Sequence, residues 1–285
     1  MKEKEISLAC DLNTVTWPLY EGLVDPKGME LNFQPFDDVN AMFDRMFIHQ
    51  EFDAAELFMS SYFIALDQGI NDFVAIPVFP SRVFRHGFIF VNDDSGIEEP
   101  TDLRGKDIGV RSYSMTAALW QRGILQHEYG VQPSDMHWHQ LLPQGAGDDA
   151  PLDITVPDDV QLDHIPSDRT LDGMLAEGEI DAFAAPYVPP SYDGENVRRL
   201  FPDYRQIEEE YYEKTGHFPI MHCIVIRREV YEENKWVATS LMDAFTEAKN
   251  KTLTKLETGS RKKLAIPWTY EHIERVREVV GDDYW

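Results

Sequence analysis

Short apolar segments alternate with amphipathic segments along the first part of the chain, and this alternation restricts the fold more than any other feature. The amphipathic segments 39–50 and 60–68 have helical periodicity, with an Asp pair (37–38) and a Ser pair (60–61) as candidate N-caps. Apolar segments of strand length lie at 6–10, 31–36, 54–58 and 74–79. This pattern predicts an α/β fold in which a mostly parallel sheet carries helices on both faces.

The same alternation continues beyond residue 90, without an internal repeat. Turn-rich residues 102–110 lead into a short strand and a helix at 115–129, and a helix at 171–178 precedes a buried strand at 180–185. Further segments of helical or strand character lie at 220–228, 236–256 and 271–280. We expect the strand at 220–228 to return to the first lobe.

Two crossings of the chain, near 88–92 and 222–227, would make the first lobe discontinuous. The expected lobes are therefore 1–90 with 222–285, and 91–221, each of ordinary domain size. Ligands bind outside the carboxyl ends of strands in open parallel sheets. We therefore expect a ligand cleft between two lobes.

The net charge of −25 excludes partners that are themselves strongly anionic. Nucleic acid and an anionic membrane surface would both be repelled. A carboxylate ligand would be repelled too, unless a local group of cationic side chains attracts it. The acid excess is compatible with a high-salt habitat, where screening is strong, and equally with an ordinary acidic protein.

The two cysteines, Cys10 and Cys223, lie in apolar segments of strand character. Buried free thiols are the expected state, and no pattern supports a disulfide. The N-terminus has no apolar signal segment, and no stretch of 18 apolar residues occurs. We therefore expect a soluble cytoplasmic protein.

Two stretches, 79–86 and 216–223, concentrate aromatic, proline and titratable residues, and each leads into an apolar run. Their candidate ligand-binding side chains are Arg82, Arg85, His86, His217 and His222. A guanidinium group binds carboxylate bidentately and stacks on ring faces. These stretches therefore indicate a planar anionic ligand.

A third polar stretch follows the strand that ends near residue 110. Arg111, Tyr113, Ser114 and Thr116 lie where this strand turns into the helix at 115–129. The N–H groups at a helix N-terminus favour an anion. Ordinary N-capping by Ser114 is a second interpretation, compatible with the first.

The stretches 79–86 and 216–223 resemble those of the 4,5-dihydroxyphthalate decarboxylase family, and the resemblance covers nearly the whole chain. Residues 102–110 (DLRGKDIGV) and 178–182 (GEIDA) are similar to signatures of type II periplasmic solute-binding folds. The resemblance implies non-oxidative loss of carbon dioxide from a hydroxylated aromatic dicarboxylate. The chain departs from the family by ending at Trp285, where members usually continue into a helical tail, which bears on activity and oligomeric state.

This chemistry needs a base near a phenol, an acid over the ring carbon and cations for the carboxylates. Imidazole titrates near working pH, so His222 and His86 are the acid/base candidates, with Glu56 as an alternative base. We expect Arg82, Arg85 and Arg111 to bind carboxylates. Further candidates for contact with substrate are Ser60, Tyr113, Ser114, Thr116, Tyr187 and His217.

No cofactor is expected, because the ring itself takes up the electrons. A divalent metal held by His86, His222 and Glu56 is conceivable, but no metal-ligand spacing supports it. His137 and His139 alternate like one face of a strand, yet two imidazoles alone are a weak metal signal. Surface or hydrogen-bonded histidines are the preferred interpretation of that pair.

Two other functions stay open at this point. A receptor that binds a small carboxylate and releases it unchanged would have the same fold, since fold does not determine function. A pyrimidine-precursor synthase of the thiamine-biosynthesis type would need a reactive histidine beside a cofactor-binding lysine, and no lysine of the sequence is placed in that way. The expected partner is a small aromatic carboxylate, with a homo-oligomer also compatible.

Overall fold

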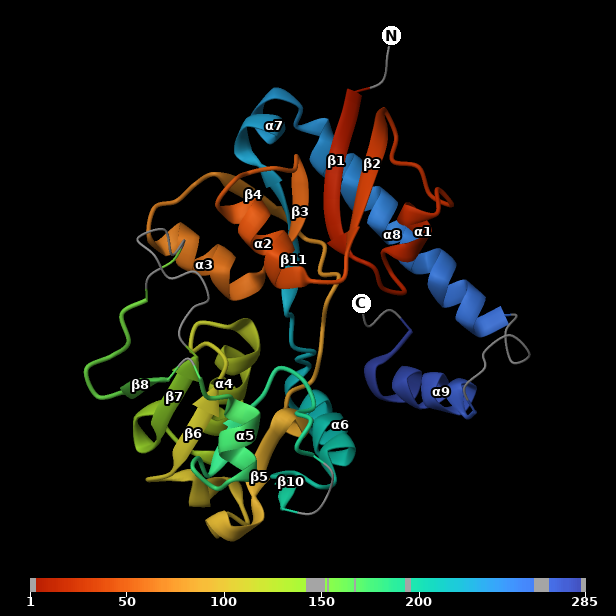
Figure 1. Ribbon diagram of the computed structural model, residues 1–285. Helices are drawn as coiled ribbons and strands as arrows, with labels where there is room; N and C mark the ends of the chain where they lie inside the picture. The colour runs from red at the N-terminus through yellow and green to blue at the C-terminus, as the bar shows by residue number, and fades with distance from the viewer. Residues whose placement is uncertain are drawn as a thin grey trace. The chain divides into compact units, whose positions relative to one another are not determined.

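The computed structural model describes residues 4–141, 152, 154–166, 168–192, 196–258 and 267–282. The chain forms two compact units, one of Met1–Arg82 with Ile220–Trp285 and the other of Val83–Pro219. Each has its own sheet and its own helices (Figure 1). None of the helices in the described part of the chain has the length and apolar character to cross a membrane.

The sheet of unit 1 has five strands in the order β2-β1-β3-β11-β4. These strands are β1 (Lys4–Asp11), β2 (Met29–Phe36), β3 (Ala54–Phe58), β4 (Phe73–Ile76) and β11 (His222–Arg227). β1 pairs in parallel with β2 and β3, whereas β11 runs antiparallel between β3 and β4. The sheet is therefore mixed, with the returning strand β11 inserted into a set of parallel strands.

Helices cover both faces of this sheet: α1 (Trp17–Tyr20), α2 (Val39–Phe47), α3 (Met59–Asp67), α7 (Arg228–Glu233) and α8 (Trp236–Thr258). Apolar residues of α1, α7 and α8 pack with Ile6, Leu8 and Ile224 on one face, and α2 packs on the other. The α2 helix begins as expected, because the Asp38 carboxylate accepts from the N–H groups of residues 40 and 41. The last helix of unit 1 is α9 (Thr269–Val280).

Unit 2 has a six-stranded sheet in the order β10-β5-β9-β6-β7-β8. The strands are β5 (Ile89–Asn92), β6 (Asp107–Val110), β7 (His137–Leu141), β8 (Gln161–Ile165), β9 (Ala182–Ala184) and β10 (Val197–Arg199). β9, β6, β7 and β8 are parallel to one another, and β5 and β10 add antiparallel pairs. The α/β class with helix-flanked sheets is confirmed, and both sheets are mixed.

Helices α4 (Thr116–Tyr129) and α5 (Leu171–Ala176) pack on opposite faces of the unit 2 sheet. Gly109 leaves room for this packing, since a Cβ there would lie 2.5 Å from Ile180 Cδ1 and 2.8 Å from Leu171 Cδ2, and these side-chain ends would have to shift. Helix α6 (Tyr204–Thr215) follows β10. Short 3₁₀ turns complete the unit at His86–Phe88, Asp93–Ser95, Pro100–Leu103 and Pro133–Asp135.

The chain crosses between the units at Arg82–Val83 and at Pro219–Ile220. The expected boundary after residue 90 falls inside β5, whose pairing with β9 and β10 belongs to unit 2. At the second crossing the structure divides the chain between Pro219 and Ile220, two residues before the expected boundary between 221 and 222. Local backbone pairing, which apolar character alone does not reveal, accounts for the difference at the first crossing.

Two N-cap predictions were wrong. The N-cap of α3 is Phe58, not Ser60 or Ser61, because the helix starts directly from the end of β3. The N-cap of α4 is Met115, and the Ser114 hydroxyl lies 2.9 Å from the Ser112 hydroxyl. Residues 143–159 are rich in Asp, Gly and Pro, which predicts a solvated loop, and they fall largely outside the described residues.

Candidate functional site

The carboxyl ends of the parallel strands in unit 1 bring together residues that are far apart in the sequence. β1 ends at Asp11 and β3 at Phe58, and the antiparallel strand β11 begins at the same edge with His222. The β3–β11 register places His222 opposite Phe58 and Ile224 opposite Glu56. This is the edge at which ligands bind in open parallel sheets.

A hydrogen-bonded pair of Glu56 and His222 is the central feature of this edge. Oε1 of Glu56 lies 2.6 Å from Nδ1 of His222, and the Glu56 side chain is fully buried. A carboxylate only accepts, so Nδ1 carries the proton of this bond and Nε2 remains for a ligand. The His222 side chain is 14% exposed, and the rings of Phe43 and Phe58 pack against it edge-on.

Asp11 is a third member of this group that sequence reasoning missed. Its N–H donates to Oε2 of Glu56 at 3.0 Å. Burial raises the pKa of the Asp11 carboxyl, the nearby Glu56 raises it further, and His222 partly opposes this. A carboxylate at the end of a predicted strand was the signal available in the sequence.

Both cysteines are buried free thiols, as expected, and they lie beside the same carboxylate. Burial, followed by the charge of Glu56, raises the pKa of Cys10 and raises that of Cys223 to about 12. Thiols of this kind stay protonated, and only the thiolate is a nucleophile. We therefore assign neither cysteine a chemical role.

Two further predicted residues belong to unit 1. Ser60 is buried in the first turn of α3, the helix that starts at the end of β3. Arg82 forms an antiparallel bridge with Ile220, and its guanidinium lies 5.3 Å from the centre of the Phe79 ring. Both crossing segments are thus tied to each other next to β11.

Unit 2 collects its own set of predicted residues at the carboxyl edge of its sheet. β6 ends at Val110, and the parallel strand β9 ends at Ala184. Arg111 follows the first strand and is partly buried, while Tyr187 follows the second and is 46% exposed. Thr116, at the start of α4, is buried, and the Tyr113 N–H donates to Gln140 Oε1 at 2.9 Å.

Two side chains of α4 that sequence reasoning missed hold this edge together. Gln121 donates through Nε2 to the carbonyl oxygens of Phe88 and Ala185, each at 3.0 Å. The Arg122 guanidinium lies 3.7 Å from the centre of the Tyr113 ring, and burial lowers its pKa to about 10. Both lie within a helix, where an isolated polar residue gives no local signal of burial.

The structure places Arg85 and His86 in the interior of unit 2. Arg85 Nη1 donates to the Pro186 carbonyl at 3.1 Å, and burial lowers the Arg85 pKa to about 10. The His86 ring is 1% exposed and lies among the rings of Tyr129, Phe201 and Tyr211. Burial lowers the His86 pKa to about 4, so the ring is neutral at physiological pH.

His217 is exposed, and its N–H donates to the Thr215 hydroxyl at 3.1 Å. The rings of Trp120 and Tyr211 are its aromatic neighbours, with centroids 6.3 and 6.4 Å away. His217 thus belongs to unit 2, whereas His222 belongs to unit 1. The two histidines of one sequence stretch therefore have different surroundings.

Glu208 of α6 shares the His86 environment. Its Oε1 accepts from the Gly87 N–H at 3.0 Å. Burial raises the Glu208 pKa to about 7, although the Gly87 hydrogen bond and the arginines nearby oppose this. Because the folded value lies above the ordinary value of 4.5, the unfolded chain loses this proton first as pH rises.

Glu208 therefore destabilises the fold progressively from about pH 4.5 to pH 7. We expect the Glu208→Gln variant to gain stability relative to the intact protein across this window, by roughly 1–3 kcal/mol. Urea unfolding at a series of pH values measures the difference. The change should be small below pH 4.5, and a difference that does not vary with pH would contradict the assignment.

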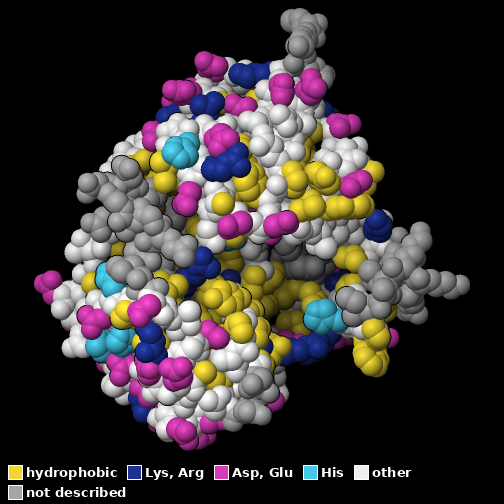
Figure 2. Space-filling model, viewed as in Figure 1, with side chains coloured by type: hydrophobic (Ala, Val, Ile, Leu, Met, Phe, Trp, Pro, Cys, Tyr) yellow, Lys and Arg dark blue, Asp and Glu magenta, His cyan; other side chains and the backbone are white. Residues whose placement is uncertain are grey.

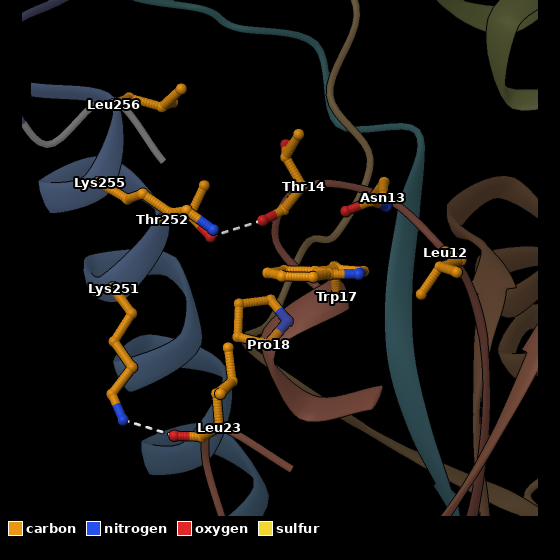
Figure 3. Close-up of a pocket in the computed structure, with 10 residues that line it drawn as sticks. All are labelled: Leu12, Asn13, Thr14, Trp17, Pro18, Leu23, Lys251, Thr252, Lys255 and Leu256. Carbon is orange, nitrogen blue, oxygen red and sulfur yellow. Dashed lines mark hydrogen bonds between the residues drawn. The ribbon is translucent and has the colours of Figure 1, made fainter. Parts of the chain in front are cut away.

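Unit 1 also contains a pocket of about 680 Å³ between the end of β1, α1 and the last turns of α8 (Figure 3). The Trp17 ring lies beside Pro18 in its wall, and the Lys255 ammonium lies 4.7 Å from the ring centre. Hydrogen bonds from Thr252 to the Thr14 carbonyl and from Lys251 to the Leu23 carbonyl tie α8 to this wall. The volume is within the range of small-molecule sites.

Acidic side chains are spread over the visible surface of both units, as the net charge requires (Figure 2). Against this background, a carboxylate ligand needs cations placed next to it. Arg82 in unit 1 and Arg111 in unit 2 are partly exposed and lie at the carboxyl edges of their sheets. They are therefore better candidates than the buried Arg85.

Solved structures of periplasmic binding proteins have a similar fold. The aliphatic sulphonate binding protein SsuA from Escherichia coli is similar with a TM-score of 0.53 and 14% identity, covering 88% of this chain and 77% of that one. The alkanesulfonate-binding protein SsuA from Xanthomonas axonopodis pv. citri, bound to MOPS, gives 0.51 and 12%, over 98% and 79%. Residues 11–146 match the family model of the phosphonate periplasmic substrate-binding protein of ABC transporters. These likenesses show that the chain has a periplasmic-binding-protein-like α/β fold.

Sequence relatives identify the family. A 4,5-dihydroxyphthalate decarboxylase from Comamonas testosteroni is 35% identical over 287 residues, which cover 100% of this chain and 87% of the relative. The enzyme of the same name from Pseudomonas putida is 36% identical over 192 residues, covering 67% and 74%. The chain belongs to the 4,5-dihydroxyphthalate decarboxylase family.

Proposed function

We propose that this protein is a carboxy-lyase that removes one carboxyl group of 4,5-dihydroxyphthalate, or of a closely related hydroxylated aromatic acid, as carbon dioxide. Family membership along the whole chain supports the reaction. The observation that supports its mechanism is the buried Glu56 carboxylate held 2.6 Å from Nδ1 of His222. Such a pair orients an imidazole and stabilises the cation that forms when it takes up a proton.

Direct loss of carbon dioxide from the ring would leave an aryl carbanion in the ring plane, which the π-system does not stabilise. In the proposed route the para hydroxyl loses its proton, and its electrons flow into the ring. His222 takes up a proton from water on Nε2, and this imidazolium then gives that proton to the carboxyl-bearing carbon. The carbon–carbon bond then breaks, carbon dioxide leaves, and aromaticity returns. One proton replaces one carboxylate, so no oxidant or reductant is needed.

The residues around His222 in unit 1 each have a defined part in this route. Glu56 positions the imidazole and compensates its charge, and Phe43 and Phe58 limit the directions in which Nε2 points. Asp11, which donates its N–H to Glu56, is a second carboxyl next to the pair and a candidate acceptor for the phenol proton. The proposal assigns no proton transfer to His86, because its ring is enclosed by three aromatic side chains.

Carboxylate binding falls to the partly exposed arginines. Arg82 lies beside the strand that begins with His222. Arg111 lies next to Ser112, Ser114 and the N-terminus of α4, where N–H groups favour an anion. No bound organic cofactor is part of this proposal, since the hydroxylated ring acts as the electron sink.

The Trp17 pocket is a candidate surface for the aromatic ring of the ligand. The pocket-lining residues Leu12, Asn13 and Thr14 directly follow Asp11, the last residue of β1. We expect the Trp17→Leu variant to bind an aromatic carboxylate more weakly by ~0.5–1.5 kcal/mol, the usual worth of an aromatic pair. Calorimetry with the intact protein and with Trp268→Leu, an exposed tryptophan outside the pocket, measures the effect. Equal affinity of all three proteins would exclude this pocket from the site.

A binding protein without catalysis is the second candidate, favoured by its fold relatives. Incubation of the purified protein with 4,5-dihydroxyphthalate, while carbon dioxide release and ring absorbance are followed, separates the two. Release that depends on protein concentration supports the enzyme. Binding without release, tested with and without added divalent metal and at low and high salt, would replace the enzyme proposal with the receptor.

A further inference from the structure

A second group of titratable side chains lies in unit 2 at the opposite ends of its strands. Asp107 and His137 are the first residues of β6 and β7, and His139 follows on β7. Parallel pairing places Asp107 next to His137, and His139 next to Asp163 of β8. Because paired residues and alternate residues of a strand share a face, all four side chains project from one face of the sheet. This edge is opposite to the one that carries Arg111.

The distances within this group are short. Oδ1 of Asp107 lies 2.7 Å from Nε2 of His139 and 3.0 Å from Nδ1 of His137. The other ring nitrogen of His137, Nε2, lies 2.9 Å from Oδ2 of Asp163. The two imidazole rings are 4.4 Å apart. Figure 2 shows histidine and acidic side chains together over the region of β7 and β8.

We propose that Asp107, His137 and His139 bind a divalent transition-metal ion, with zinc as the best match. Among the described residues, they are the one group of three or more His, Cys, Asp or Glu side chains whose ligand atoms all lie within 4.8 Å. Ligand atoms of a tetrahedral zinc site are roughly 3.4 Å apart. The distances from Asp107 Oδ1 to the two imidazole nitrogens, 2.7 and 3.0 Å, therefore need to lengthen by less than ~1 Å to admit the ion at ordinary bond lengths.

The donor set selects the class of metal. Two imidazoles and one carboxylate suit zinc and its first-row neighbours, whereas calcium and magnesium prefer oxygen ligands alone. The carboxylate of Asp163 accepts a hydrogen bond from the far nitrogen of His137, which fixes the ring with Nδ1 toward the ion. The side chains of His139, His137 and Asp107 are 19%, 34% and 44% exposed, so water reaches the remaining coordination positions.

The ion would link neighbouring strands of the unit 2 sheet. Asp107 lies on β6 and both histidines lie on β7, while Asp163 extends the network to the edge strand β8. A ligand that binds only the folded state stabilises it by mass action. Zinc should therefore raise the unfolding temperature of the protein. The group lies at the amino ends of β6 and β7, whereas Arg111 lies at the carboxyl edge of the same sheet. We therefore assign the ion a stabilising role and no part in substrate chemistry.

Zinc titration of the chelator-treated full chain by calorimetry tests the proposal. We expect one ion per chain, and a much weaker affinity in His137→Gln and in His139→Gln. Asp163→Asn should weaken binding by roughly 10–100-fold, the usual effect of losing an orienting carboxylate. His164→Gln is the matched control, because this β8 histidine contacts Gln140 instead and should leave zinc affinity unchanged.

Unfolding temperatures with and without zinc give a second measurement. We expect zinc to raise the unfolding temperature of the intact protein and of His164→Gln, but not that of His139→Gln. Circular dichroism without metal checks that each variant folds. If a variant fails to fold, cobalt absorption bands and zinc-induced shifts of two histidine ring signals in the intact protein decide. Absence of zinc binding, unchanged binding in both β7 variants, or binding lost in His222→Asn instead would overturn the proposal.

Discussion

Replacing His222 with Asn is expected to lower turnover by roughly 10²-fold or more while changing substrate affinity little. Asparagine keeps a polar side chain that hydrogen-bonds to Glu56, but it has no group that titrates near neutral pH. Because the imidazole is proposed to transfer the proton to the ring carbon, the loss should appear in kcat and not in KM. Steady-state kinetics with 4,5-dihydroxyphthalate, together with calorimetry, measures both.

Two controls make the His222 result specific. His217→Asn changes a histidine of the same sequence stretch that lies in unit 2, and its turnover should fall much less. Product formed by the intact enzyme in heavy water should carry deuterium at the vacated ring position, because the proton comes from an exchangeable group. Full turnover in His222→Asn, with product still labelled, would move the proton transfer to another residue.

Replacing Arg111 or Arg82 with Met is expected to weaken binding of an aromatic dicarboxylate by ~1.5–3 kcal/mol, or roughly 10–150-fold. Methionine retains much of the apolar stem and removes the guanidinium that forms charged hydrogen bonds with carboxylate. A neutral dihydroxybenzene should bind to the variants almost as it binds to the intact protein. Calorimetry with both ligands gives the comparison.

A matched control removes one positive charge elsewhere. Arg205, on the exposed side of α6, pairs with Glu209, and Arg205→Met makes the same change in net charge. Its effect on dicarboxylate affinity should be small and should vanish with added salt. If Arg111→Met and Arg205→Met weaken binding equally, the long-range field and not a local contact attracts the ligand. Equal losses for the neutral and the dicarboxylate ligand would show that Arg111 is structural.

Most strands and helices were predictable because their signals are local. Residues 54–58, apolar except for Glu56, form β3, and the carboxylate at position 38 caps α2 as expected. The segment 115–129 differs from α4 by one residue at its start. Short or polar elements were missed: β8 and β10 have no clear periodicity, and α6 carries few apolar residues. Their formation depends on pairing and packing with neighbours.

The roles of the histidines were less predictable, because the same residue type serves several environments. His86 and His222 both occupy motifs that resemble the family, yet one is enclosed by aromatic rings and the other is held by Glu56. His137 and His139 had only a weak signal, because their third ligand, Asp107, lies on another strand. Distance along the chain conceals such contacts.

The sequence by itself determined the α/β class, the family and the residue types from which a carboxylate-binding, proton-transferring site is built. These features follow from periodicity and motifs that are written in consecutive residues. Only the tertiary structure decided which of those residues meet. Glu56 and His222 are 166 positions apart, and they form a pair because β11 returns antiparallel beside β3. Strand order and register, which arise from long-range pairing, thus select the candidate site from the candidates that the sequence supplies.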